Sequence, residues 1–536
     1  MSKRPLNTNV IDGSKRPSSL NSEICNSYPG YCPGFGSVTV DEINVPSSKE
    51  EIDLFYQNYV LRRRPCKFKG VSSKEVLSEP LSPLNLVKTL PEQTILQVER
   101  KVQGGFGSGE KRLKMTLGEL VERLRSGDEQ LYLTTQYAED DPDRDDASDV
   151  GENTEEYAED DDDNEDDTKE TDGGFGSAGD ISDAGSFDFS NAHDDFEDLN
   201  GAESMDGESH DSKDVIAQLS TGPLTQFEAD ARVKELYQPP MDNLIEQLPE
   251  TPSFLNSLIP QQINLWVGSS GNIGSSDKFL EGFDPSAPKL GLGRAIPGGG
   301  SSSGLHHDHA DNIYVPISGR KRFTLFSPRD AAKMYTVGTI RKVYDSGVID
   351  YARCETAPFW RTLRDDGAIE AEVAKNELEF NSSLTADQRQ NLERVIEADS
   401  VCSSSIDSKL DPPSFSSIIP TVVHLDKVKD EGLRAEIKKV ALEKWPMFFE
   451  ANRLTVDLRP GEMLYLPTGW FHEVTSFGNE QTASADDRIH VAVNYWFIPP
   501  NGSSQDQLYA HEDQYWQKDY ERTKAALEHA RFCSKD

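Results

Sequence analysis

Residues 138–215 separate the sequence into two parts that are able to fold. Between Glu139 and Asp214, about 32 acidic residues stand against roughly 3 basic ones, and large apolar residues are few. A segment of this composition cannot bury enough apolar surface to offset the entropy that it would lose on ordering. We therefore predict a disordered acidic insertion over 138–215, so that any β domain must be assembled from residues on both sides of it.

The charge of the chain bears on its partners. The formal net charge is −39, and about −29 of it belongs to the acidic insertion. The sequence has no zinc-finger spacing and no basic helix, and a chain that is acidic overall repels the phosphates of nucleic acids. We therefore predict no direct nucleic-acid partner.

The cysteines and the apolar runs bear on the compartment. The six cysteines include no C-x-x-C pair, and a chain of 536 residues needs no disulfide staples, so we expect reduced thiols. No stretch approaches the roughly 18 consecutive apolar residues of a membrane span, and the N-terminus lacks the apolar run of a secretory signal. We predict a protein of the cytoplasm, the nucleus or both, without membrane association.

Strand patterns dominate both foldable parts. Short alternating or apolar runs are bounded by Gly and Pro turns, which favours a sandwich or jelly roll over alternating α/β units. The predicted fold class is mainly β with flanking helices (α+β). Strands are expected over 130–134, 263–268, 313–325, 454–458, 463–466 and 489–497.

Helices are expected around this β structure. Ser48 stands three residues before Glu51, as in a capping box, and an amphipathic pattern follows. A second helix is expected over 116–125. Near the C-terminus one helical face can pack on the barrel, which we favour, or form a homodimer with a second subunit. That face carries Tyr509, Trp516, Tyr520 and Leu527.

The patterns divide the chain into a tail, two parts of one β domain, and a C-terminal helix. Pro316 interrupts a strand that should be central, which predicts a β-bulge or an edge position there. The expected segments are a disordered tail over 1–37, the N-terminal part of the domain over 38–137, its larger part over 216–500 with insertions at 269–300 and 329–410, and a C-terminal helix over 501–536.

Three histidines and two carboxylates are concentrated in residues 306–311, in a chain with 10 histidines. In an extended segment, a period of two places His306 and Asp308 on one face. Such an H-x-D pair supplies two of the three ligands of a 2-His-1-carboxylate triad, which leaves coordination positions on iron open. For the third ligand, His472 follows an apolar strand and a Pro/Gly turn. We favour it over His490, which sits inside an apolar strand where histidine is more often a core residue.

Around these residues the sequence resembles the JmjC hydroxylases. It is most similar to the small JmjC lysyl hydroxylase, and weaker similarity reaches back to residues 55–70. The motifs that carry the resemblance are LHHD at 305–308 with Asn312, GRKRFTLFSP at 319–328, PGEMLYLP at 460–467, WFH at 470–472 and VNYW at 493–496.

The resemblance implies a double-stranded β-helix, a jelly roll of the cupin type. His306, Asp308 and His472 would bind Fe(II), with 2-oxoglutarate and dioxygen as cosubstrates. Lys321 would pair with the distal carboxylate of 2-oxoglutarate, in agreement with the cost of burying an ammonium group without an anion. The residues that match further positions of the cosubstrate pocket are Ser303, Tyr132, Asn312 and Asn494. For the two asparagines, hydrogen bonding within strands is the alternative.

The activity that the resemblance implies is hydroxylation of a protein side chain, with lysine as the candidate residue. A JmjC lysine demethylase is one alternative, although the sequence shows no reader domain or cysteine-rich zinc module. A non-catalytic cupin that serves as a binding scaffold is another, which the presence of all three ligands and Lys321 disfavours. The acidic insertion would attract a basic protein substrate, although such a segment more often only stays solvated.

Overall fold

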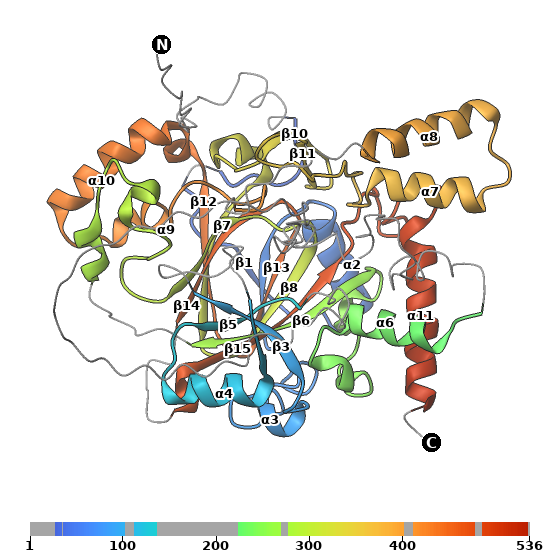
Figure 1. Ribbon diagram of the computed structural model, residues 1–536, viewed down its shortest axis with the longest axis horizontal. Helices are drawn as coiled ribbons and strands as arrows, with labels where there is room; N and C mark the ends of the chain where they lie inside the picture. Colours follow the sequence, from blue (N-terminus) through green and yellow to red (C-terminus); the bar gives the residue numbers. More distant parts are fainter. Residues whose placement is uncertain are drawn as a thin grey trace, which may run out of the picture.

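Two β-sheets lie face to face at the centre of the protein, and helices surround them (Figure 1). This computed structural model describes residues 27–34, 36–101, 112–136, 223–269, 277–400, 411–477 and 485–533. The predicted acidic insertion over 138–215 lies outside the described residues. No helix in the described ranges is long and apolar enough to span a lipid bilayer.

The larger sheet contains nine strands in the order β1-β2-β13-β8-β15-β6-β5-β3-β4. Only the β1 and β2 pair is parallel. Because β1 to β5 precede the acidic insertion, this sheet joins the two foldable parts of the chain. The bounds are β1 Asp41–Asn44, β2 Cys66–Lys69, β3 Ile95–Arg100, β4 Leu113–Thr116, β5 Leu131–Leu133, β6 Pro260–Ser269, β8 Asp311–Ser318, β13 Glu462–Leu466 and β15 Ile489–Phe497.

The smaller sheet contains four antiparallel strands in the order β12-β9-β14-β7. The predicted strands on either side of the turn at 459–461 both form, but β12 and β13 lie in opposite sheets, so that turn carries the chain between the sheets. The prediction of a mainly β jelly roll with flanking helices is confirmed. The bounds are β7 Ser301–His306, β9 Arg320–Phe326, β12 Arg453–Leu458 and β14 Phe471–Phe477.

Alternation along the central strands separates side chains that face the other sheet from those that face outward. On β8, Tyr314 packs in an apolar cluster with Phe323 and Val474 of the smaller sheet. Its neighbours Ile313 and Val315 belong to a different cluster on the outer face. The even-numbered residues of β8 therefore line the space between the sheets, where a functional site would be shielded from water.

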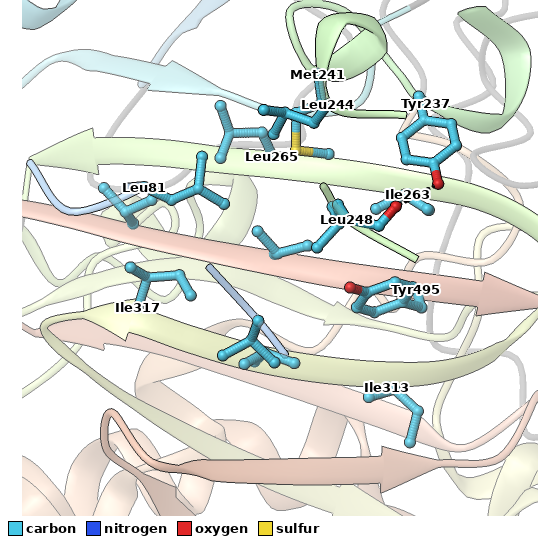
Figure 2. Packing of buried hydrophobic residues seen from close by; sticks show 14 of the residues in the cluster. Leu81, Tyr237, Met241, Leu244, Leu248, Ile263, Leu265, Ile313, Ile317 and Tyr495 are labelled. Carbon is cyan, nitrogen blue, oxygen red and sulfur yellow. Dashed lines mark hydrogen bonds between the residues drawn. The ribbon is translucent and has the colours of Figure 1, made fainter. Parts of the chain in front are cut away.

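Helices cover the outer face of the larger sheet. Figure 2 shows Tyr237, Met241 and Leu244, which follow α6, packed against Ile263 and Leu265 of β6. Each such buried side chain contributes about 1.5–3 kcal/mol of hydrophobic stabilisation. The helices on this side are α2 Lys49–Phe55, which continues as a π-helix over Tyr56–Val60, α3 Leu86–Thr89, α4 Leu117–Ser126, α6 Gln226–Leu236 and α11 Tyr515–Cys533.

The predicted helix starts agree with the structure. Ser48 and Glu51 form the capping box of α2, and Thr116 and Glu119 form the same arrangement at α4. In both, the hydroxyl accepts a hydrogen bond from the third backbone N–H, and the glutamate accepts one from the capping residue. The two helices therefore begin where the sequence indicates.

A second group of elements covers the outer face of the smaller sheet. Leu305 of β7 and Phe471 of β14 point outward into an apolar cluster that includes Val422 and Ile437. The predicted insertion over 329–410 supplies a two-stranded sheet and a helical hairpin that projects from the molecule (Figure 1). The elements that the insertion supplies are β10 Thr339–Val343, β11 Ile349–Ala352, α7 Glu370–Phe380 and α8 Ala386–Ser400. The group is completed by α9 Pro420–Val423 and α10 Glu431–Lys444, which follow the insertion.

The predicted tail of residues 1–37 is too long at its C-terminal end. Residues 1–26 lie outside the described ranges, but Tyr28 is buried in the cluster beside the smaller sheet. The ring of Tyr31 stacks on Trp470 with centroids 6.3 Å apart. Two aromatic side chains offset the ordering entropy of a segment whose Ser, Asn, Pro and Gly content predicts mobility.

The predicted C-terminal helix begins later than residue 501, at Tyr515, because a glycine and turns precede it. Its predicted apolar face is buried within the chain, with Trp516 and Leu527 5% and 1% exposed. Arg522 of this helix forms an ion pair with Glu228 of α6, at 2.6 Å. This packing is intramolecular, and the homodimer through the same helix stays a prediction.

Pro316 lies directly beside a β-bulge in a central strand. The pairing of β15 with β8 shifts register between Val491 and Ala492, and Ala492 faces Pro316. On the other side of β8, the pairing with β13 ends at Tyr314. A residue without an N–H group is tolerated here because the ladder is interrupted on one side and has ended on the other.

Candidate metal centre

The structure brings His306, Asp308 and His472 together between the two sheets. His306 is the last residue of β7, Asp308 lies in the following loop, and His472 is the second residue of β14, where it pairs directly with His306. The nearest carboxylate oxygens of Asp308 lie 3.7 Å from His306 Nε2 and 3.6 Å from His472 Nε2. One ligand atom from each residue falls within 4.8 Å of the other two, which fits a single metal ion.

Backbone carbonyls fix which nitrogen each imidazole presents. Nδ1 of His306 lies 3.1 Å from the carbonyl oxygen of Gly304, and Nδ1 of His472 lies 2.9 Å from that of Trp470. A carbonyl only accepts hydrogen bonds, so both Nδ1 atoms carry the proton and both Nε2 atoms keep a lone pair. Metal-binding histidines are commonly oriented in this way.

Hydrogen bonds to the backbone carbonyl of Asp308 hold the loop that carries this residue. The carbonyl oxygen of Asp308 accepts hydrogen bonds from Gly469 N at 2.9 Å and Thr468 Oγ1 at 3.2 Å. Asn312 Nδ2 donates to the Asp308 carboxylate at 3.4 Å. These contacts attach the H-x-D loop to the turn that precedes His472. They therefore hold His472, which is distant in the sequence, close to His306 and Asp308.

The electrostatics of the three residues favour a bound cation. His306, Asp308 and His472 are 9%, 8% and 3% exposed. Burial raises the pKa of Asp308, with the charge of His472 opposing that shift. Burial, and then the neighbouring His472, lowers the pKa of His306 well below its ordinary value. A neutral imidazole and a buried carboxylate suit a divalent metal, whose charge offsets the cost of burying the carboxylate.

A buried ion pair supports the same loop from the N-terminal part of the chain. Arg63 makes a two-pronged contact with Asp311, in which Nη1 lies 2.9 Å from Oδ2. Asp311 also accepts from the hydroxyl of Tyr465 at 2.7 Å and from Thr468 N at 3.0 Å. The sequence contains no signal for this pair, because its partners stand 248 positions apart.

The two predicted asparagines form a chain of hydrogen bonds that ends at the metal ligands. Trp266 Nε1 donates to Asn494 Oδ1 at 2.9 Å, and Asn494 Nδ2 donates to Asn312 Oδ1 at 3.3 Å. Asn312 in turn contacts Asp308. Both asparagine side chains lie between the sheets, so they are placed to orient a carboxylate ligand.

Lys321 lies at one end of the space between the sheets, with two neighbours from opposite parts of the chain. Its Nζ donates to the hydroxyl of Tyr132 at 2.9 Å and to Ser476 Oγ at 2.6 Å. Burial lowers the pKa of Lys321 well below its ordinary value, with the nearby Lys101 as the second cause. His490, the alternative metal ligand from the sequence, lies here instead, with Nε2 3.2 Å from Lys321 Nζ.

The surroundings of Lys321 also have features of a ligand site. A Cβ on Gly268 would lie 2.5 Å from the ring of Tyr132, so only glycine leaves room for that ring. The buried hydroxyl of Tyr314 has no hydrogen-bond partner among the described residues. An anionic molecule with hydrogen-bonding oxygens would offset both the buried ammonium and the unpartnered hydroxyl.

Ser303 is not brought to Lys321. Its Oγ donates to the carbonyl oxygen of Gly304 at 2.8 Å and accepts from Val474 N at 3.0 Å. Two residues of β7, Ser303 and Gly304, stand opposite one residue of β14, which is a β-bulge. The bulge reverses the alternation of β7 and turns the Ser303 side chain away from Lys321. The serine hydroxyl that Lys321 contacts comes from Ser476 instead, a residue that sequence reasoning missed.

Phe415 is a further residue that sequence reasoning missed. The ring of Phe415 stacks on that of His306, with centroids 4.8 Å apart and planes 11° apart. The guanidinium of Arg294 lies over the Phe415 ring, 5.0 Å from its centroid. Phe415 follows the predicted insertion over 329–410, where no family motif indicates its position. The segment that directly follows the insertion therefore contacts a residue of the candidate metal centre.

A second group of metal-type side chains lies away from the sheets, at Asp365, Asp366 and His511. His511 Nε2 lies 2.6 Å from Asp365, and Asp366 makes a two-pronged contact with Arg364. The arginine already neutralises one carboxylate, so this group is an ion-pair network that joins the 364–368 loop to the segment before α11.

Comparisons with known proteins agree with the fold. Residues 52–503 match the model of the cupin-like domain family. The chain is 26% identical over 534 residues to "JmjC domain-containing protein 4" of Schizosaccharomyces pombe, which covers 89% of this chain and 88% of that protein. It is 25% identical over 239 residues to "Lysine-specific demethylase JMJ32" of Arabidopsis thaliana, covering 44% of this chain and 42% of the relative. The family match spans every strand of the two sheets except β1, together with His306, Asp308 and His472, and the chain therefore belongs to the cupin-like family of JmjC proteins.

Proposed function

We propose that this protein is an Fe(II)- and 2-oxoglutarate-dependent dioxygenase that hydroxylates a side chain of a protein, with lysine as the candidate residue. The observation that carries the proposal is the convergence of His306 Nε2, Asp308 and His472 Nε2 between the same two sheets that bury Lys321. A 2-His-1-carboxylate triad is the ligand set of non-haem Fe(II) oxygenases. When bound there, iron with 2-oxoglutarate and dioxygen supplies the oxidant for an unactivated C–H bond.

The residues of the chain hold, orient and shield these reactants. The histidines and Asp308 occupy one side of the metal and leave other positions for small molecules. Lys321, Tyr132 and Ser476 present one ammonium and two hydroxyl groups to the distal carboxylate of 2-oxoglutarate. Water is excluded by the closely packed sheets, which strengthens each of these polar contacts.

Conversion of 2-oxoglutarate to succinate tests the proposal. Purified protein with Fe(II) should form succinate, and His306→Ala should not, while its melting temperature without metal stays close to that of the wild type. Proteins captured by the enzyme should carry a 16-dalton addition with the wild type only. A wild-type protein that binds neither Fe(II) nor 2-oxoglutarate would favour a non-catalytic scaffold and reject the proposal.

Demethylation of a methylated lysine is the second candidate, and the name of the Arabidopsis relative favours it. The same iron chemistry directed at an N-methyl group yields an unstable carbinolamine, so formaldehyde is released. Formaldehyde from methylated peptides would support demethylation, whereas a stable 16-dalton product without formaldehyde supports hydroxylation.

We also propose a basic protein as the substrate, since the acidic insertion would raise its encounter rate through complementary charge. Deletion of residues 139–214 should then reduce turnover of that substrate at low salt more than at high salt. A deletion variant whose turnover of that substrate, and the salt dependence of that turnover, equal those of the wild type would contradict this role for the insertion.

A further inference from the structure

Lys321 has a second lysine close to it that no family motif indicates. Lys321, Ser476 and Ser301 are register partners in one row across β9, β14 and β7, so their side chains share one face of the smaller sheet. Lys321 Nζ donates to Ser476 Oγ at 2.6 Å, and Lys101 Nζ donates to Ser301 Oγ at 2.9 Å. The two ammonium groups therefore bind neighbouring hydroxyls of the same row.

Lys101 reaches this row from the opposite sheet. It directly follows β3, is 6% exposed, and also donates to the carbonyl oxygen of Ser269 at 3.2 Å. The Nζ atoms of Lys101 and Lys321 lie 5.8 and 5.3 Å from the centroid of the Tyr132 ring. Tyr132 is thus common to both lysines, and its hydroxyl binds one of them.

Two ammonium groups in one buried space oppose each other unless an anion joins them. The side-chain contacts of Lys101 are a hydroxyl and a carbonyl, and in the described part of the chain no carboxylate lies within 4.0 Å of its Nζ. Burial lowers the pKa of Lys101 to about 8. Lys101 is also a cause of the lowered pKa of Lys321. A ligand carboxylate placed between the two groups would offset both desolvation and repulsion.

We propose that Lys101 is a second anchor for the distal carboxylate of 2-oxoglutarate, which is held between Lys101 and Lys321 beside Tyr132. This inference rests on the proposed function, because it concerns the same cosubstrate. Lys101 is a binding residue in this scheme and takes no part in the oxidation. It also explains why the row ends in two serines: each hydroxyl fixes one ammonium group and still has lone pairs for orientation.

The competing explanation is that Lys101 only stabilises the end of β6 through its hydrogen bond to the carbonyl oxygen of Ser269. Two substitutions separate these roles. Lys101→Gln keeps a hydrogen-bond donor without the charge, whereas Lys101→Arg keeps the charge. Anion binding predicts rescue by arginine and not by glutamine, and a purely structural contact predicts that glutamine suffices.

The test measures binding of 2-oxoglutarate by calorimetry with Mn(II) in place of Fe(II), so that no turnover is needed. Lys101→Gln and Lys101→Met should weaken binding by at least about tenfold, as expected when one of two charge partners is removed, and should leave Mn(II) affinity unchanged. Lys88→Met, at an exposed lysine of α3, is the matched control and should bind like the wild type. Lys101→Arg should recover most of the lost affinity.

A cosubstrate analogue gives the sharper comparison. 2-Oxopentanoate has the same chain length as 2-oxoglutarate but lacks the distal carboxylate, so Lys101→Gln should affect its binding little. Equal losses for both ligands, or wild-type affinity of Lys101→Gln for 2-oxoglutarate, would overturn the inference. If Lys321→Met still loses binding in that case, the proposed function stands without Lys101; if wild-type protein binds no 2-oxoglutarate with Mn(II), the proposed function itself fails.

Discussion

His306 and His472 face each other directly across β7 and β14, with ring centroids 4.3 Å apart, although 166 positions separate them in the sequence. Directly opposed residues of neighbouring strands share a face, so the pairing aims both imidazoles into the space between the sheets. The backbone carbonyls at Gly304 and Trp470 then select Nε2 on each ring. Strand register therefore brings these two imidazoles together.

Removal of a metal ligand should abolish metal binding without unfolding the protein. Asp308→Ala takes away the carboxylate, and we expect Mn(II) affinity to fall by at least a hundredfold and succinate formation to stop. Without metal, its melting temperature should equal or exceed that of the wild type, because the buried carboxylate costs desolvation. His529→Ala on α11, away from the site, is the control. Undiminished Mn(II) binding by Asp308→Ala would remove this residue from the ligand set.

Loss of Arg63 should destabilise the fold far more than loss of its neighbour Arg64. Arg63 and Asp311 are 4% and 0% exposed, and Arg63→Met leaves Asp311 as an uncompensated buried charge. We expect the free energy of unfolding to fall by about 3–5 kcal/mol. Arg64 pairs with Asp41 at the surface, where the side chains are 30% and 39% exposed, so Arg64→Met should cost about 0–1 kcal/mol.

Urea denaturation measures both variants. Adding Asp311→Asn to Arg63→Met removes the orphaned charge and should recover part of the loss. Similar midpoints for the Arg63 and Arg64 variants would show that the buried pair is not needed to hold the H-x-D loop.

Substitution of two serines distinguishes the pocket from the bulge. Ser476→Ala removes a hydroxyl bound to Lys321 and should raise the dissociation constant of 2-oxoglutarate about fivefold to tenfold. Ser303→Ala removes the acceptor for Val474 N and should cost about 1 kcal/mol of stability with little change in cosubstrate affinity. The reverse pattern would restore the position that the family resemblance gives to Ser303.

The affinity for 2-oxoglutarate should decrease as the pH rises through the pKa of Lys101, which burial lowers to about 8. A carboxylate binds the protonated amine, so binding is strongest below this pH and requires proton uptake above it. The decrease should be up to about tenfold per pH unit. Lys321 faces the same carboxylate and remains in Lys101→Met, so the difference between the two pH profiles reports on Lys101. Calorimetry at pH 6.5 to 9.5 with Mn(II) measures it, and parallel profiles would contradict the prediction.

Sequence patterns were sufficient for features that depend on local spacing. The alternation at His306 and Asp308, the capping box of Ser48, and the interruption at Pro316 all follow from neighbouring residues. Family resemblance added Lys321 and the two asparagines, which the structure places beside the triad or in the same space between the sheets.

Features that depend on register and on distant contacts were beyond the sequence. One extra residue in β7 turns Ser303 away from Lys321, and no local signal marks that bulge except Gly304, whose φ is +78°. The partners of Lys101 and Arg63 lie far away along the chain, where local spacing gives no guidance. Phe415 follows an insertion without a recognised pattern, so its stack on His306 required coordinates.

Tyr132 of β5, on the N-terminal side of the acidic insertion, binds Lys321 on its C-terminal side. Neither side of the insertion therefore supplies by itself all the residues of the proposed cosubstrate site. Proteolysis within residues 138–215 would leave two fragments whose activity depends on staying associated, and separately produced halves should regain cosubstrate binding only when mixed.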